Sequence, residues 1–286
     1  MKKEKKQHLV GIIGRSISHT LSPAMHTAAF DALGLPFRFG VFDVEAEYLP
    51  ALVASFRTQG IGGASVTIPH KERIIPLLDS LDENARMLGA VNAVVNRNGL
   101  LTGYNTDVVG IEKTLASVQG KIRNSTALVL GAGGGARAVV YTLSKIFSPA
   151  RIRLYNRTTT RAQTMIDEFK KIFPKIAYEN ISDPLQPAIA ESTLIVNTTS
   201  VGMTPNIDAL PVPAVIRFSN QQIIFDIIYT PLETALLRRA KKDGAQTING
   251  VEMLVQQGAA AFELWTGKQF PVEVGRKALI HALTKA

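Results

Sequence analysis

The sequence predicts an α/β protein made of two domains. Its 286 residues are more than one hydrophobic core usually accommodates. Short apolar runs typical of buried parallel strands, such as residues 127–130, alternate with segments of helical periodicity. Apolar residues make up 46% of the chain and charged residues 19%, which is typical of a globular α/β protein. We therefore expect two α/β domains rather than one.

A glycine-rich turn follows that apolar run. It reads Gly131-Ala132-Gly133-Gly134-Gly135-Ala136, a G-x-G-x-x-A form of the dinucleotide-binding fingerprint. Gly131 permits the tight turn, Gly133 lets the backbone approach a pyrophosphate, and small Ala136 allows close packing of helix on strand. A helix predicted over residues 136–147 offers free N–H groups to phosphate oxygens, and a second strand follows over 151–155. This context predicts a Rossmann-type domain with a parallel sheet.

The residues after the second strand indicate which dinucleotide binds. An NAD site usually has Asp or Glu there, roughly 20 residues after the glycines, to bind the ribose 2′-hydroxyl. Here the strand is followed by Asn156, Arg157 and Thr158, with Arg161 one helical turn further on. Two guanidinium groups could bind a 2′-phosphate or stack on adenine, and no carboxylate would repel it. We therefore predict NADP(H); the alternative is a glycine-rich helix entry with ordinary surface arginines.

Composition excludes several classes of site. The chain has no Cys, which rules out disulfides and thiolate metal sites, and its five histidines lack metal-ligand spacing. We therefore expect no metal. The basic start resembles a signal peptide, but its apolar run spans only residues 9–13, so we expect a strand behind a basic tail. No run approaches the roughly 18 apolar residues of a membrane span, and we expect a cytoplasmic protein without membrane contact.

The formal net charge of +9 does not by itself indicate nucleic-acid binding. Part of it lies in the basic tail at Lys2, Lys3, Lys5 and Lys6, and the rest is dispersed along the chain. A nucleic-acid site would need a clustered basic stripe or aromatic platforms, and neither is visible. Attraction of an anionic cofactor and an anionic small-molecule substrate is a sufficient explanation of the charge.

Three places in the first half carry candidate site residues. Ser22 and Pro23 are expected to open a helix that extends to about residue 33, so the hydroxyls of Thr20 and Ser22 could bind a carboxylate at its N-terminus or serve as caps alone. Lys71 falls in the first turn of a helix predicted over 70–78, where the helix dipole disfavours its ammonium form. Asp107 is either the N-cap of a helix over 108–119 or a general acid/base partner.

Other polar residues are expected at strand ends. Asn92 lies among apolar strand residues, where an unpaired amide would be costly, so it must hydrogen-bond to backbone or ligand. The loops over 197–203 and 225–231 each follow a predicted strand, at the edge of an open sheet where ligands collect. The remaining expected strands and helices are 8–14, 37–43, 45–59, 64–68, 82–88, 100–104, 175–179, 193–197, 222–227, 232–242, 245–248, 251–266 and 272–284.

These motifs together resemble the shikimate dehydrogenase family. Between about Gly11 and Leu283 they occur in that family's order: HTLSPAMH, SVTIPHKE, GAVNA, GYNTD, GAGGGARA, NRTTTRA, NTTSVGM, DIIYTPLET and GVEMLVQQGAAAFELWTG. The resemblance implies reversible NADPH-dependent reduction of 3-dehydroshikimate to shikimate, a step toward aromatic amino acids. It also implies an N-terminal substrate domain over residues 1–107, completed by 250–286, and a Rossmann-type NADP domain over 108–249.

The resemblance also assigns roles to residues of this chain. Lys71 and Asp107 would be the catalytic pair. The substrate would be bound by Thr20, Ser22, Thr67, Asn92, Tyr229 and Gln257. The cofactor would be bound by Gly131, Gly133, Gly134, Gly135, Ala136, Asn156, Arg157, Thr158, Arg161, Thr198, Ser200, Gly250 and Met253.

Three positions depart from the family pattern. Thr20 stands where Ser is common, Ser65 replaces a usual Asn, and Val108 follows Asp107 where Gly is common. Thr20 bears most directly on the choice between shikimate and quinate, which keeps open a quinate/shikimate dehydrogenase that uses NAD as well as NADP. A non-catalytic NADP-binding protein is the alternative from another class. We expect a monomer or a homodimer.

Overall fold

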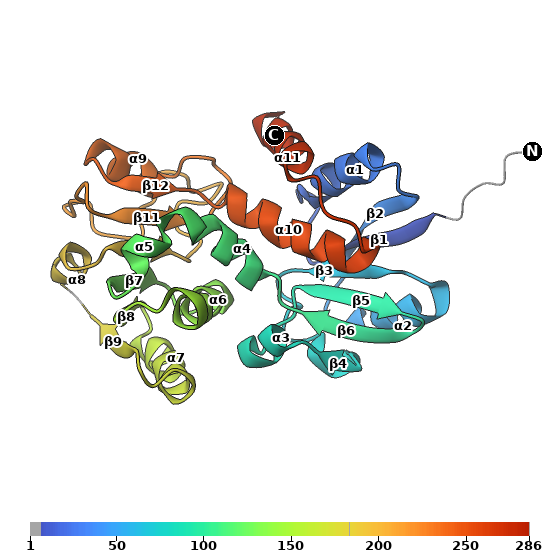
Figure 1. The fold of residues 1–286 in the computed structure, drawn as a ribbon, viewed down its shortest axis with the longest axis horizontal. Helices are drawn as coiled ribbons and strands as arrows, with labels where there is room; N and C mark the ends of the chain where they lie inside the picture. Colours follow the sequence, from blue (N-terminus) through green and yellow to red (C-terminus); the bar gives the residue numbers. More distant parts are fainter. Residues whose placement is uncertain (1–6, 183, 286) are drawn as a thin grey trace, which may run out of the picture. The chain divides into compact units, whose positions relative to one another are not determined.

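The structure is a computed structural model that describes residues 7–182 and 184–285, so the predicted basic tail lies outside the described residues. The chain divides into two compact units, which are both drawn in Figure 1. Unit 1 comprises Met1–Gly110 and Val255–Ala286, and unit 2 is the intervening Ile111–Leu254. Among the described residues, no helix is both long and apolar enough to cross a membrane.

A mixed sheet forms the centre of unit 1. Its strand order is β2-β1-β3-β5-β6-β4. The strands β1, β2 and β3 are parallel, whereas β5 is antiparallel to both β3 and β6. Asn98 and Gly99 both have positive φ in the β5–β6 hairpin, as a tight turn of this kind requires. The strands are β1 (His8–Gly14), β2 (Phe37–Asp43), β3 (Gly63–Val66), β4 (Ser80–Leu81), β5 (Ala93–Arg97) and β6 (Leu100–Tyr104).

Helices cover both faces of this sheet. Alternate residues of β3 face opposite sides: Ala64 and Val66 pack in the core formed with α2, while Gly63 lies against the ring of Trp265 from α10. A Cβ at Gly63 would lie 2.6 Å from Trp265 Nε1, which explains the glycine. The helices of unit 1 are α1 (Ser22–Ala32), α2 (Leu49–Gln59), the 3₁₀ turn η1 (Ile75–Leu77), α3 (Glu83–Leu88), the first part of α4 (Asp107–Leu115), most of α10 (Val251–Thr266), and α11 (Val272–Lys285).

An aromatic cluster joins the two ends of the chain within unit 1. His26 of α1 stacks on Phe39 of β2 with ring centroids 4.6 Å apart, and its ring lies 5.3 Å from that of Trp265. Phe30 stacks on Phe262 of α10 at 5.0 Å. Burial lowers the pKa of His26 to about 3, so this ring is neutral and belongs to the core.

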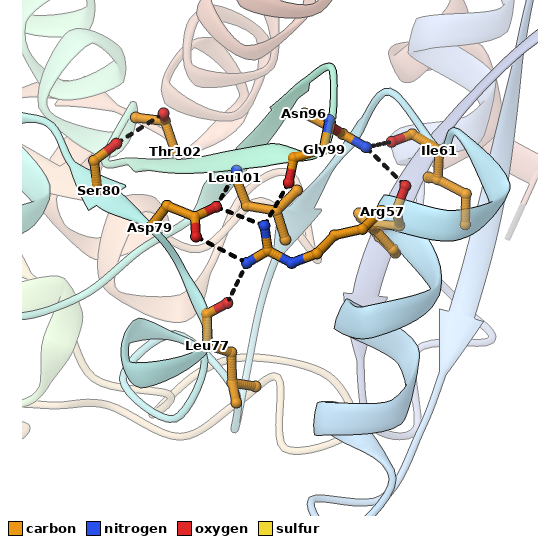
Figure 2. Close-up of polar contacts among 10 residues, drawn as sticks. Arg57, Ile61, Leu77, Asp79, Ser80, Asn96, Gly99, Leu101 and Thr102 are labelled. Atoms are coloured by element: carbon orange, nitrogen blue, oxygen red, sulfur yellow. Dashed lines mark hydrogen bonds and ion pairs between the residues drawn. The ribbon is translucent and has the colours of Figure 1, made fainter.

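A polar cluster fixes the end of α2 to the edge of the sheet (Figure 2). Arg57 binds both oxygens of Asp79, with Nη1–Oδ2 at 2.6 Å and Nη2–Oδ1 at 3.2 Å, and donates to the carbonyls of Leu77 and Gly99. Asp79 also accepts from the Leu101 N–H at 2.7 Å. These bonds lower the pKa of the Asp79 carboxyl, chiefly through the hydrogen bond from Arg57. The cluster anchors the chain just after the segment that carries Lys71.

Unit 2 is built on a parallel sheet with the strand order β12-β11-β10-β7-β8-β9. This is the order of a doubly wound dinucleotide-binding fold, with its switch point between β7 and β10. The predicted Rossmann-type domain is thereby confirmed. The strands are β7 (Thr126–Leu130), β8 (Arg151–Tyr155), β9 (Ala177–Ile181), β10 (Leu194–Asn197), β11 (Ile223–Asp226) and β12 (Gln246–Ile248).

Helices pack against this sheet and leave its carboxyl edge to loops. Leu128 of β7 and Ile195 of β10 share a core with α8 and α9, α6 lies against β7, and α7 lies against β8 and β9. The helices are the rest of α4, η2 (Ala116–Val118), α5 (Gln119–Ile122), α6 (Gly134–Thr142), the π-helical η3 (Leu143–Phe147), α7 (Thr159–Ile172), α8 (Gln186–Ala190) and α9 (Ala235–Lys242).

Several predicted helices have different bounds, and the one expected over 232–242 begins only at Ala235. The helix expected over 45–59 begins only at Leu49, with Pro50 in its first turn, where the missing N–H of proline leaves no helical hydrogen bond unmade. The helix expected over 108–119 is divided into α4, η2 and the start of α5.

Candidate functional site

An ion pair in unit 1 joins two of the predicted site residues. Lys71 Nζ lies 2.6 Å from Asp107 Oδ2, and the side chains are 31% and 15% exposed. Asp107 Oδ1 accepts a hydrogen bond from Asn92 Nδ2 at 2.9 Å. Both carboxylate oxygens are therefore held, and the ammonium group remains partly open to solvent, where a substrate could reach it.

Lys71 does not lie in a helix, so the prediction of a helix over 70–78 is wrong. The segment forms turns followed by the short η1, and the Lys71 carbonyl accepts from the Val91 N–H at 2.8 Å rather than from a residue one helical turn on. His70 is fully buried and fixes the same turn through Nε2 to the Val44 carbonyl at 2.9 Å. The helix-dipole argument for Lys71 is consequently wrong, and its ion pair with Asp107 takes its place.

Asn92 is only 2% exposed, and the prediction that its amide must be hydrogen-bonded is confirmed. Its Oδ1 accepts from the Thr106 N–H at 2.6 Å, and Nδ2 lies 3.0 Å from Thr106 Oγ1. Nδ2 also lies 3.5 Å from Oε1 of Gln257 on α10. Four residues that are far apart in sequence, at positions 71, 92, 107 and 257, therefore meet in one polar cluster. Asn105 supports it by accepting from the Asp107 N–H at 3.2 Å.

The predicted capping role of Ser22 is wrong. α1 begins at Ser22, and Leu21 before it already has helical φ and ψ, whereas a capping residue needs extended backbone. Instead, Thr20 Oγ1 accepts from the N–H of Ser22, the first residue of α1, at 3.4 Å. Thr20 Oγ1 lies 3.4 Å from Ser22 Oγ, so the two hydroxyls lie together at the start of α1. Thr67 follows β3 and is half-buried.

The glycine turn of unit 2 has the features that a dinucleotide pyrophosphate needs. Gly131 has φ +112°, and a Cβ there would lie 2.6 Å from Thr198 Oγ1. Gly133 and Gly134, in contrast, border open space, since a Cβ at either would meet nothing within 4 Å. α6 begins at Gly134, two residues earlier than predicted. Gly133 is its N-cap residue and has no side chain that could bind the free N–H groups of the first turn. The backbone N–H groups at this helix start are therefore available to phosphate oxygens.

This contrast gives a prediction for Gly133→Ala. Gly133 has an extended backbone (φ −100°) that alanine adopts, so we expect the free energy of unfolding to change by only about 0.5 kcal/mol. The methyl group would occupy the space of the pyrophosphate, and we expect the NADPH dissociation constant to rise about tenfold or more. Gly120→Ala is the control, because a Cβ at Gly120 would also meet nothing within 4 Å, but Gly120 lies in α5 and away from the glycine turn. Unchanged NADPH binding in Gly133→Ala would mean that the pyrophosphate lies elsewhere.

Two arginines follow β8 at the predicted adenosine end of the site. Arg157 and Arg161 are exposed, and neither guanidinium has an ion-pair or hydrogen-bond partner among residues 7–182 and 184–285. Asn156 Nδ2 donates to the Thr158 carbonyl at 2.8 Å and so shapes the turn between β8 and α7. The residues present therefore fit a 2′-phosphate, since two cations are uncommitted and the turn contains no carboxylate.

The other predicted residues of unit 2 lie in the loops after β10 and β11 and at the start of α10. Thr198 Oγ1 donates to the Leu130 carbonyl at 2.6 Å, which fixes this loop to the strand before the glycine turn, and Ser200 is exposed. Tyr229 is half-buried, and burial raises the pKa of its hydroxyl. A Cβ at Gly250 would lie 2.1 Å from the Ile227 carbonyl, so only glycine fits there. Met253 lies in the first turn of α10.

Asn197 and Asp226 are buried at the ends of β10 and β11; they fall in the predicted ligand-edge segments 197–203 and 225–231, but the sequence assigned neither a role of its own. They are paired in register across the parallel strands, and Asn197 Nδ2 donates to Asp226 Oδ1 at 3.0 Å. The sequence does show a polar residue at the last position of each of two buried strands. It does not show that these two strands are neighbours in the sheet, which is what brings the two residues together. Within the described residues, no three His, Asp or Glu side chains are grouped as metal ligands.

Comparisons with known proteins show which families this chain is similar to. The family model of the shikimate dehydrogenase substrate binding domain matches residues 12–94, and that of the shikimate 5′-dehydrogenase C-terminal domain matches 250–280. The shikimate dehydrogenase (NADP(+)) of Geobacillus kaustophilus is 42% identical over 280 residues, which cover 98% of this chain and 100% of that protein.

Two solved structures are similar over nearly their whole length. Shikimate 5-dehydrogenase from Thermus thermophilus, in complex with NADP(H) and shikimate, has a TM-score of 0.86 at 36% identity and covers 97% of this chain and 100% of its own. Quinate dehydrogenase from Corynebacterium glutamicum, in complex with NAD, has a TM-score of 0.89 at 29% identity, and the match covers 96% of this chain and 99% of that one.

Proposed function

The chain belongs to the shikimate dehydrogenase family, and we propose that it catalyses the reversible NADPH-dependent reduction of 3-dehydroshikimate to shikimate. The observation that carries the proposal is the Lys71–Asp107 pair, in which an ammonium group is held at 2.6 Å by a carboxylate that Asn92 fixes from its other side. A partly exposed cation held in this way is suited to a substrate oxygen that becomes negative during the reaction.

The chemistry requires a hydride and a proton. NADPH, when bound, supplies the hydride for the carbonyl carbon of the substrate. As the carbonyl becomes a hydroxyl, negative charge develops on its oxygen, and the Lys71 ammonium group would stabilise that charge more in the transition state than in the substrate. The Lys71–Asp107 pair then delivers the proton to this oxygen, and in the reverse direction removes it. Asp107 also orients Lys71.

The other polar residues would orient the substrate. The hydroxyls of Thr20 and Ser22, with that of Tyr229, would bind its carboxylate, in keeping with the position of the Thr20 and Ser22 hydroxyls together at the start of α1. Thr67, Asn92 and Gln257 would bind its hydroxyl groups, which is consistent with the Asn92–Gln257 contact. Orientation of this kind supplies a large part of enzymatic rate enhancement.

Unit 2 would hold NADP(H). The pyrophosphate would lie over Gly131, Gly133, Gly134, Gly135 and Ala136, and the 2′-phosphate would bind Arg157 and Arg161 beside Asn156 and Thr158. Thr198, Ser200, Gly250 and Met253 would border the nicotinamide. We further propose that the protein works in the cytoplasm as a monomer or homodimer on a small-molecule substrate. The dispersed positive charge supports the lack of a nucleic-acid partner.

The test is the absorbance of the NADPH band with shikimate or quinate as the substrate and each oxidised cofactor in turn. We expect turnover with shikimate and NADP⁺ to exceed the other three combinations. Comparable turnover with quinate and NAD⁺ would instead support a relaxed quinate/shikimate dehydrogenase, which Thr20 and the similarity to quinate dehydrogenase favour as the second candidate. Tight NADPH binding without turnover on either substrate would contradict both and indicate a non-catalytic protein.

A further inference from the structure

We propose that Asp226 is a positioning residue that holds two ligand-contacting loops of unit 2 in register with each other. One is the loop over residues 198–201 after β10, and the other is the segment over 227–234 that carries Tyr229. The inference rests on the proposed function, because that function gives both loops their ligands.

Asp226 is the last residue of β11 and is 0% exposed. Its Oδ1 accepts from the Ile228 N–H at 3.1 Å and from Asn197 Nδ2 at 3.0 Å. Its Oδ2 accepts from Thr234 Oγ1 at 2.7 Å. One buried carboxylate therefore binds the end of β10, its own following segment and the start of α9.

Asn197 links Asp226 to the first loop by hydrogen bonds. Its Oδ1 accepts from both the backbone N–H of Thr199 at 3.1 Å and the Thr199 hydroxyl at 2.7 Å. Thr199 Oγ1 in turn accepts from the Val201 N–H at 3.2 Å. The amide orientation of Asn197 is set by Asp226, because an oxygen facing Asp226 would leave two acceptors in contact. The conformation of residues 198–201 therefore depends on the carboxylate.

Thr234 links Asp226 to the far end of the second segment by a hydrogen bond. Its Oγ1 accepts from the Leu237 N–H at 3.3 Å and caps α9, so its proton is available for Asp226. The segment between Asp226 and Thr234 is thus fixed at both ends. It also meets its neighbours through backbone bonds from Gly250 N–H to the Ile228 carbonyl at 3.0 Å and from Thr204 N–H to the Thr230 carbonyl at 3.2 Å.

Burial disfavours the charged form of this carboxylate. Burial raises the pKa of Asp226 to about 6, and the hydrogen bonds from Thr234, Ile228 and Asn197 only partly oppose this shift. The adjoining β10 and β12 contain no charged residue, and Glu233 and Arg238 nearby pair with Lys241 and Asp208. Since the folded pKa exceeds the unfolded one, ionising Asp226 lowers fold stability as the pH rises from about 4 to about 6.

The experiment measures kcat and the KM values for shikimate and NADP⁺ in Asp226→Ala, Asp226→Asn and wild type. We expect Asp226→Ala to lower kcat/KM about 100-fold and to raise both KM values. The reason is that small displacements of the loop residues that contact substrate and cofactor strongly reduce the rate. Asp226→Asn keeps an acceptor for Asn197 and Ile228 and should lie within about threefold of wild type. Rescue by asparagine together with a shift in both KM values is the expected signature.

Two milder variants cover the case in which Asp226→Ala does not fold. Asn197→Ala should raise mainly the KM for NADP⁺, and Thr234→Val mainly that for shikimate, each about tenfold, whereas Thr234→Ser keeps the hydroxyl and should match wild type. Wild-type kinetics in Asn197→Ala and Thr234→Val, or an unchanged pair of KM values in a folded Asp226→Ala, would overturn the inference. If wild type itself does not oxidise shikimate, the proposed function fails instead.

Discussion

Replacing Lys71 with alanine is expected to lower kcat by about 10²–10⁴-fold, the range in which a positioned proton donor contributes. The reason is that alanine removes the cation held 2.6 Å from Asp107, while Asp107 keeps its bond to Asn92. The KM for NADPH should change little, because the proposed cofactor residues lie in unit 2. Steady-state kinetics, with circular dichroism to verify folding, measure both.

The matched control is Lys268→Ala, which removes an exposed lysine of unit 1 outside the proposed site and should have wild-type kinetics. Asp107→Asn should also lower kcat, because a neutral amide attracts the Lys71 ammonium group less strongly than a carboxylate does. If the two residues act as one unit, the double variant will be no slower than Lys71→Ala alone. A kcat within a few-fold of wild type in Lys71→Ala would remove this lysine from the mechanism.

The second large effect is expected for Arg157→Ala combined with Arg161→Ala. Each guanidinium that binds a 2′-phosphate contributes a charge-assisted hydrogen bond, so each loss should weaken NADPH binding about 10- to 100-fold. Binding of NADH, which lacks that phosphate, should stay the same. Fluorescence titration with both cofactors gives the two dissociation constants and therefore the change in preference.

Arg123→Ala is the control for this pair, because Arg123 is also an exposed arginine of unit 2. It should leave both dissociation constants unchanged. An equal loss of NADPH and NADH affinity in the double variant would show that the arginines act on the fold or on the general charge. An unchanged NADPH affinity would place the 2′-phosphate elsewhere.

Segments with strong local patterns were the most predictable. Residues 151–155 form β8 and residues 251–266 form α10, as expected from an apolar run and from helical periodicity. The parallel sheet followed from the glycine turn in its strand–turn–helix context. In these segments local preference and tertiary packing favour the same structure.

Predictions failed where a distant part of the chain supplies the hydrogen-bond partner. A helix after Pro69 was reasonable from local sequence, but Val91 binds the Lys71 carbonyl. Ser22 had the features of a cap, yet the backbone before it is already helical. The role inferred for Asp226 required its register with Asn197, which sequence spacing does not contain.

The division of the chain between the two units has a consequence for biosynthesis. Unit 2 is one continuous stretch, whereas unit 1 receives Trp265, Phe262 and α11 only from the last part of the chain. On the ribosome, where domains generally fold as their residues emerge, unit 2 has all its strands before unit 1 can close its aromatic cluster. Gly63 and His26 therefore stay uncovered by Phe262 and Trp265 until residues 255–286 have left the ribosome.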